Sequence, residues 1–280
     1  MKRFEIEYGK DASCFTSLEI KDAFKQLNFV SVYMAANFRS QLSNYTQWCI
    51  NRNMVADYQN HYLEITNFTD YVHHIKARRK IIARDEFIDA ISNLNNVCDM
   101  YALLAIFEGV NGKNRSEILN LHVSDINRDN NIVTLHGINK VRTLKVSDKL
   151  IEWAIESADT FTYTALSGRQ LQFAQDEDKD LVFKNFGNAQ ESSDDFYKGR
   201  RLYFRLDKSL DVLGLDDLSL NSIMDSGKIH MINMIAKQNN ITGVDVLNNS
   251  ELIQPVSKQY DVDMAIKRSI FIKNYEEYLV

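Results

Sequence analysis

The stretch that decides the fold is residues 109–126, which read G-V-N-G-K-N-R-S-E-I-L-N-L-H-V-S-D-I. It ends a segment, residues 85–121, in which apolar residues recur at the spacing of two consecutive helices. Residues 127–131, N-R-D-N-N, predict a turn, and residues 132–135, I-V-T-L, predict a strand. Residues 141–146 then predict the returning strand of a hairpin. The stretch therefore joins a pair of helices to a small antiparallel hairpin.

The remainder of the chain is predicted to be mainly helical. It contains one proline, Pro255, and 10 glycines, so few residues interrupt a helix. We expect a short arm or edge strand over residues 1–15 and consecutive helices from Ser17 onward. Further helices are expected at 149–158, 197–213, 220–238 and 261–279, with exposed acidic loops around 181–183.

Composition sets the class of protein. Its 280 residues allow two domains, and 45% hydrophobic with 25% charged residues is usual for a globular chain. Cys14, Cys49 and Cys98 have neither zinc-ligand nor disulfide-framework spacing, and no cofactor is expected. The N-terminus has no secretory pattern, so we expect a cytoplasmic protein. The net charge of −5 argues against a uniformly basic surface, but phosphate binding depends on local charge.

The motif carries a family resemblance. Gly112–Leu121 (G-K-N-R-S-E-I-L-N-L) followed by Ser124-Asp125-Ile126 resembles the signature of the tyrosine recombinases, the phage integrase family. The order of the other elements is similar over roughly residues 20–265. This resemblance implies a mainly α fold with a small antiparallel sheet, arranged as a two-domain clamp. It implies a helical core-binding-like domain at 1–78, a basic linker at 79–84 and a catalytic-like domain at 85–280.

In that family a tyrosine attacks a DNA phosphate while cationic side chains stabilise the transition state. The resemblance places neutral residues at the positions of the cations: Asn114, Gly137, Asn221, Met224 and Asn249. Only Tyr260 remains, at the position of the nucleophile. A neutral side chain cannot replace a guanidinium at a phosphoryl-transfer site, and each lost contact slows such a reaction about a hundredfold. We therefore expect a protein that is not an enzyme, although Lys140 can supply the hairpin lysine if the register shifts.

DNA binding can outlast catalysis, because phosphate contacts and base contacts use other side chains. The candidate phosphate-binding residues are Lys76, Arg78, Arg79 and Lys80 in the linker, Lys113, Arg115, Lys140, Arg142 and Lys228 around the old active site, and Arg200 and Arg201 in a later helix. Arg39 and Asn44 can contact bases, on a helix that we expect Phe38, Tyr45 and Trp48 to brace from the core side. The alternative for each basic run is a solvated face.

The chain also resembles the integrase-fold lysogeny repressors of SPbeta-like Bacillus phages. That resemblance implies a transcriptional repressor that binds operator-like sites on double-stranded DNA, with a regulatory protein or peptide-linked signal as a further partner. Two alternatives remain: an active recombinase that uses Tyr260 with Lys228 and Arg200 or Arg201, and a protein-interaction module. The segment 261–279 carries an apolar stripe that either packs in cis or mediates self-association.

Overall fold

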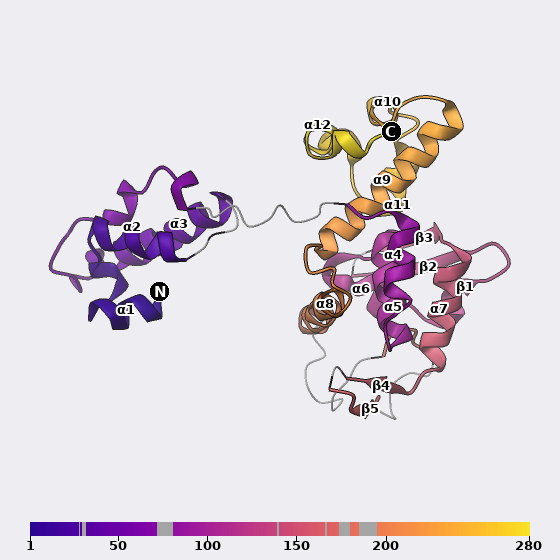
Figure 1. Cartoon of the computed structure of the whole chain (residues 1–280), viewed down its shortest axis with the longest axis horizontal. Coiled ribbons are helices and arrows are strands. Elements are labelled where there is room, and N and C mark those ends of the chain that lie inside the picture. Colours follow the sequence, from indigo (N-terminus) through magenta and orange to yellow (C-terminus); the bar gives the residue numbers. More distant parts are fainter. Residues whose placement is uncertain are drawn as a thin grey trace. The chain divides into compact units, whose positions relative to one another are not determined.

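A computed structural model describes residues 1–27, 29, 32–71, 81–138, 140–165, 167–173, 180–184 and 195–280. The chain divides into two compact units, Met1–Arg78 and Arg79–Val280 (Figure 1). Each unit is mostly helical, and the sheets of the second unit are small and antiparallel, so the predicted fold class is confirmed. No helix in the described ranges is both long and apolar enough to cross a membrane.

The N-terminal unit is built around aromatic side chains. Its elements are α1 (Lys2–Tyr8), η1 (Ala12–Cys14), α2 (Ser17–Gln26), α3 (Val32–Asn51), η2 (His61–Glu64) and η3 (Thr69–Tyr71). The ring of Phe24 packs against Phe29, Phe38 and Tyr71 at centroid distances of 5.3, 6.0 and 5.7 Å. The arm or edge strand expected at 1–15 is wrong: α1 forms there, because its one apolar face buries Phe4 in the same core.

The C-terminal unit has more elements. They are α4 (Arg84–Ile91), α5 (Val97–Phe107), η4 (Lys113–Arg115), α6 (Ser116–Leu119), η5 (Val123–Asp125), β1 (Ile126–Asn127), β2 (Ile132–Gly137), β3 (Lys140–Lys145), α7 (Asp148–Asp159), β4 (Thr162–Thr164), β5 (Gln170–Gln172), α8 (Asp195–Val212), α9 (Leu220–Asn239), α10 (Gly243–Asn248), α11 (Gln254–Tyr260), α12 (Met264–Tyr275) and η6 (Glu276–Tyr278). In Figure 1 the long helix α9 runs from beside α4 and α5 to the group formed by α10 and α12.

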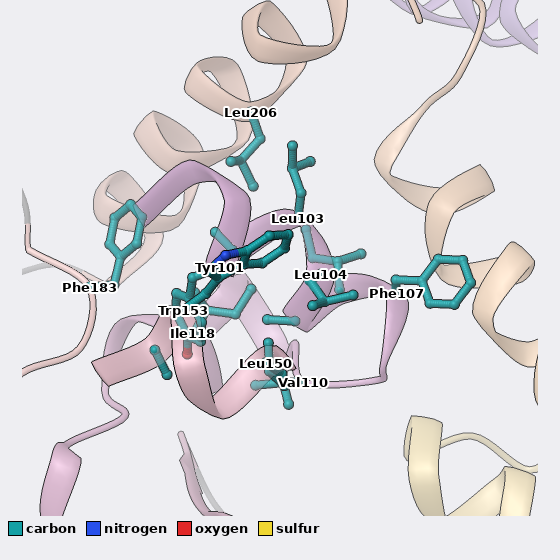
Figure 2. Close-up of a cluster of buried hydrophobic side chains, with 14 of the residues drawn as sticks. Tyr101, Leu103, Leu104, Phe107, Val110, Ile118, Leu150, Trp153, Phe183 and Leu206 are labelled. Carbon is teal, nitrogen blue, oxygen red and sulfur yellow. The ribbon is translucent and has the colours of Figure 1, made fainter. Parts of the chain in front are cut away.

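Helix α5 is the centre of this unit. It is buried on nearly every side, and its side chains meet those of α6, α7 and α8 in one cluster (Figure 2). A helix that is apolar all round must be covered on all faces, and its neighbours provide that cover. The motif 109–126 follows directly from this buried helix, so its position is fixed by the core.

The predicted hairpin is present. Strands β2 and β3 pair antiparallel, with Val133 opposite Leu144 and Leu135 opposite Arg142. Val133, Leu135 and Leu144 point into the core, as expected from the alternation of apolar and polar residues. A second hairpin, β4 with β5, forms over residues for which no strand was predicted.

Both ends of the C-terminal unit differ from expectation. Residues 81 and 82 of the expected linker are buried in the unit, and the N–H of Ile82 donates to Ser226 Oγ at 3.0 Å. The helix expected at 261–279 begins only at Met264, because Asp261 has a left-handed backbone (φ 49°) that ends α11. Helices α8 and α9 lie within a few residues of their predicted ranges.

Candidate nucleic-acid interface

The motif loop has an unusual backbone. Gly112, Asn114 and Arg115 all have positive φ, at 69°, 56° and 63°. Positive φ suits glycine, but it strains side chains such as arginine, and two such residues in succession are rare. The loop then enters the short helix α6, where Glu117 is buried.

Helix α8 packs closely against this loop. A Cβ atom on Gly199 would lie 2.0 Å from the carbonyl oxygen of Asn114, closer than any real contact. Only glycine at this position lets the helix approach so near. The basic residues of the loop and those of α8, which are far apart in the sequence, therefore share one surface.

The positions matched to the family's cations hold neutral side chains with local roles. Asn249 Oδ1 accepts the N–H groups of Glu251 and Leu252 at 2.9 and 3.2 Å, which caps the turn before α11. Met224 Sδ lies 3.8 Å from Asn111 Nδ2, and Asn221 is exposed in the first turn of α9. Gly137 ends β2 opposite Lys140.

Tyr260 is held inside the protein. Its side chain is 9% exposed, and its hydroxyl donates to the carbonyl oxygen of Phe107 at 2.7 Å. Gly227 makes room for it, since a Cβ there would lie 2.4 Å from the hydroxyl oxygen. Burial raises the pKa of Tyr260 well above its ordinary value of 10, because the phenolate would lose its hydration. In this position the hydroxyl stabilises the packing of α11 on α5.

Arg142 corrects an expectation. Its guanidinium pairs with Glu117 through two bonds of 2.6 Å and donates to the carbonyl oxygens of Gly109, Lys258 and Gln259 at 2.7, 3.1 and 2.8 Å. These contacts occupy all five N–H donors of an arginine. Arg142 therefore joins β3 to the motif and to α11, and no donor remains for a DNA phosphate.

Two lysines expected around the old active site also have internal partners. Lys228 is buried, and its Nζ lies 2.7 Å from Asp225 Oδ1, so its charge is compensated within the unit and phosphate binding by Lys228 stays a prediction. Lys140 forms an ion pair with Asp261, but both side chains are about half-exposed. An exposed pair holds its partners weakly, so phosphate binding by Lys140 stays a prediction.

The remaining basic residues form what we call the loop–α8 surface: Lys113 and Arg115 of the loop with Arg200 and Arg201 of α8. Lys113, Arg200 and Arg201 are exposed, whereas Arg115 is half-buried. Exposed aromatic rings alternate with the cations on α8, and the guanidinium of Arg200 lies 5.5 Å from the ring centre of Phe204. Arginines and aromatic rings on one face fit the backbone of a nucleic acid.

Arg205 of α8, which follows Arg200 and Arg201 in the sequence, points inward. Its Nε lies 2.6 Å from Asp99 Oδ1, and its guanidinium stacks 4.1 Å from Tyr163 and 4.9 Å from Phe183. It holds α8, α5 and the β4–β5 hairpin together. The sequence gives no signal that Arg205 faces the interior while Arg200 and Arg201 are exposed.

The second candidate surface is the outer face of α3. Asn44 is exposed there with Gln41, Gln47 and Asn51, and the helix contains no acidic residue. Tyr45 and Trp48 were expected in the core, but they are 40% and 45% exposed and stack on each other, because Ser43, Thr46 and Cys49 take the buried side. Arg52 covers the ring of Trp48 at 4.5 Å.

Arg39 stands apart from this face. It is half-buried with its guanidinium 5.6 Å from the ring centre of Phe68, and its Nε has no hydrogen-bond partner among the described residues. The linker residues Lys76, Arg78, Arg79 and Lys80 lie outside the described residues. Within the described ranges, no group of His, Cys, Asp or Glu side chains is arranged to hold a metal ion.

Comparison with known families settles the relationship. Residues 81–278 match the family described as "MrpR, C-terminal catalytic domain", and residues 1–51 match "MrpR, N-terminal core-binding domain". The chain belongs to the MrpR family. The two domain types are those of the tyrosine recombinases, so the resemblance drawn from residues 112–126 is confirmed.

Two solved structures are similar to the MrpR-family chain. The crystal structure of XerA recombinase has 14% sequence identity and a TM-score of 0.41, over 99% of this chain and 88% of that one. An integrase from mycobacterium phage Brujita has 10% identity and a TM-score of 0.39, over 94% of this chain and 83% of that one. A comparison with curated proteins finds no match.

Proposed function

We propose that this MrpR-family protein is a sequence-specific DNA-binding transcriptional repressor that does not cut DNA. One contrast carries the proposal: Tyr260 is buried and bonded to Phe107, while Lys113, Arg200 and Arg201 of the loop–α8 surface are exposed. The resemblance to phage lysogeny repressors adds the setting, a prophage held silent in the cytoplasm of a bacterial host.

Binding would use two kinds of contact. The cations of the loop–α8 surface suit phosphates, which give affinity without sequence preference. The exposed amides on the outer face of α3 suit base edges, since asparagine and glutamine pair with adenine in the major groove. The net charge of −5 does not oppose this division, because the basic residues are concentrated locally.

Lack of cleavage follows from two features together. Attack on a phosphate needs an ionisable tyrosine at the surface, and burial raises the pKa of Tyr260. It also needs cations around the pentavalent phosphate, and Asn114, Met224 and Asn249 carry none. Lys228, whose Nζ lies 5.8 Å from the centre of the Tyr260 ring, is already paired with Asp225.

Two experiments test the proposal. Chromatin immunoprecipitation in the host cell should give discrete sites, and a gel shift with those fragments should show binding that exceeds binding to unrelated DNA. A nicked suicide substrate carrying the same site should trap no covalent adduct. An adduct formed by the wild type and absent from Tyr260→Phe would establish an active recombinase instead. Absence of binding to any duplex would favour the protein-interaction module.

Self-association is a further part of the proposal. Helix α12 packs in cis through Met264 and Phe271, and its outer side leaves Ile266 and Ile270 79% and 68% exposed. Neighbouring cations Lys267 and Arg268 share this exposed side. A second protomer on DNA is the partner that would cover the isoleucines, and pairing would sharpen discrimination between an extended operator and single weak sites. The same resemblance implies that the inducing signal comes from a regulatory protein or a peptide-linked signalling pathway.

A further inference from the structure

Arg115 adopts a backbone conformation that an arginine does not favour. Its φ and ψ are 63° and 21°, and Asn114 before it is also left-handed at φ 56°. Asparagine tolerates this conformation and glycine adopts it freely, but arginine gains nothing from it. Backbone strain of this kind persists where the side chain has another use.

The charge of Arg115 is poorly compensated. The side chain is half-buried, and among the described residues its hydrogen bond is from Nη1 to the neutral Oδ1 of Asn111, at 2.6 Å. Burial lowers the pKa of Arg115, as it does for a cation without an anionic neighbour. In the described part of the chain Arg115 forms no ion pair, so most of its five N–H donors remain available to an anion.

The guanidinium is nevertheless held in place. Asn111, which accepts its hydrogen bond, donates its own N–H to Glu117 Oε2 at 2.9 Å, and Glu117 is fixed by Arg142. Helix α8 supports the other side of the loop through the close approach of Gly199 to Asn114. A cation that is ordered before its ligand arrives loses little freedom on binding.

We infer that Arg115 is a phosphate anchor: its guanidinium binds a backbone phosphate of duplex DNA beside Arg200 and Lys113. The anchor lies one residue beyond Asn114, the position at which the resemblance places an arginine in the recombinases, and next to the close contact of the loop with Gly199 of α8. The planar fork of an arginine matches two phosphate oxygens at once. No cleavage accompanies the contact, because Tyr260 is bonded to Phe107. The inference rests on the proposed function.

The test uses the full chain and a fluorescein-labelled duplex of mixed sequence, about 30 bp long, because phosphate contacts act on any sequence. Arg115→Gln should weaken binding at low salt about tenfold and reduce the slope of log affinity against log salt by about one. Arg115→Lys should keep the slope and lose several-fold in affinity, since the charge stays and the fork is lost. Arg128→Gln, an exposed arginine in the turn between β1 and β2, is the matched control and should bind as the wild type does.

Arg115→Gly separates an anchor from a structural residue. Glycine relieves the strain at φ 63°, so this variant should have a Tm at least as high as the wild type while binding DNA as weakly as Arg115→Gln. A clear fall in Tm would show that Arg115 serves the fold, and would overturn the inference. Wild-type affinity and slope in Arg115→Gln would overturn it while leaving the proposed function intact. A wild type that binds no duplex would overturn both.

Discussion

At the scale of single residues, the hydroxyl of Tyr260 is held inside the protein. Its hydrogen bond to Phe107 and its burial give it a packing role. We expect Tyr260→Phe to leave DNA binding unchanged and to lower the free energy of unfolding by about 1–3 kcal/mol, because the carbonyl oxygen of Phe107 loses its partner. Urea denaturation and a gel shift on the same preparation measure the two effects. Loss of DNA binding with an unchanged unfolding free energy would contradict this assignment.

Charge partners separate basic residues that the sequence treats alike. Lys113 and Arg142 look equally basic in the sequence, yet Arg142 meets Glu117, which is 25 residues away, and carbonyl groups more than a hundred residues away. Such contacts depend on the tertiary fold and leave no local signal. The assignment of neutral residues to the family's catalytic positions needs only the order of the motifs, and it stays a prediction from sequence.

At the scale of elements, helix α3 shows the limit of periodicity. Its apolar spacing predicted the helix, but not which aromatic residues face the core, because Ser43 and Thr46 take buried positions that aromatic side chains usually fill. Tyr45 and Trp48 are left on the outer face with the amides. The same uncertainty affects α5 less, because apart from Asp99 nearly all of its residues are apolar and buried.

The outer face of α3 gives a prediction about sequence preference. Asn44→Ala should reduce the discrimination between a genomic target site and a mixed-sequence duplex by about 1–3 kcal/mol, the usual value of a bidentate base contact. Its affinity for the mixed duplex should change little, because phosphate contacts supply that binding. Asn95→Ala, an exposed asparagine of the C-terminal unit, is the control. Competition binding measures both affinities, and equal discrimination in the two variants would remove α3 from base recognition.

The contact between α8 and the motif loop gives a prediction about stability. Gly199→Ala places a methyl group against the carbonyl oxygen of Asn114, so helix and loop must separate. We expect a loss of about 1–3 kcal/mol in unfolding free energy, as for other overpacked sites, with weaker DNA binding because the loop–α8 surface is divided. Val212→Ala, at an exposed position of the same helix, should do neither. Unchanged unfolding free energy in Gly199→Ala would mean that the loop can move away from α8 without loss of stability.

At the scale of the whole molecule, the order of helices, hairpin and late tyrosine was sufficient to predict a two-unit integrase-like fold. The division into two units could be predicted because each unit has a core of its own. One core is rich in aromatic rings, and the other is centred on α5. The second hairpin β4–β5 was missed, because each of its strands has only three residues and little alternation.

The basic run between the two units remains a prediction from sequence. If Arg78, Arg79 and Lys80 contact phosphates, replacing all three by alanine should weaken binding to every duplex alike. The slope of log affinity against log salt should fall by up to about three, one for each lost contact. Fluorescence anisotropy over a salt series measures the slope. An unaltered slope in a folded variant would make this run a solvated connector.

The C-terminus raises the question of assembly. Leu279 is buried, the carbonyl oxygen of Val280 accepts the N–H of Gly243, and the N–H of Val280 donates to Asn233. Deleting residues 262–280 would therefore unpack the unit's own core as well as any contact between protomers. Surface substitutions on α12 avoid this problem.

Ile266→Gln with Ile270→Gln should leave the fold within about 0.5 kcal/mol of the wild type, since both side chains face solvent. If α12 contacts a second protomer on DNA, the double variant should bind a single target site normally and lose cooperative binding to a fragment that carries two sites. Ile6→Gln on α1, at a position 76% exposed, changes an isoleucine in the same way outside the helix. The measurement is a gel-shift titration of the wild type, the double variant and Ile6→Gln on the two-site fragment. The same concentration dependence in all three proteins would mean that α12 packs only in cis. A steeper dependence in the wild type and Ile6→Gln alone would assign the exposed isoleucines to contact between protomers.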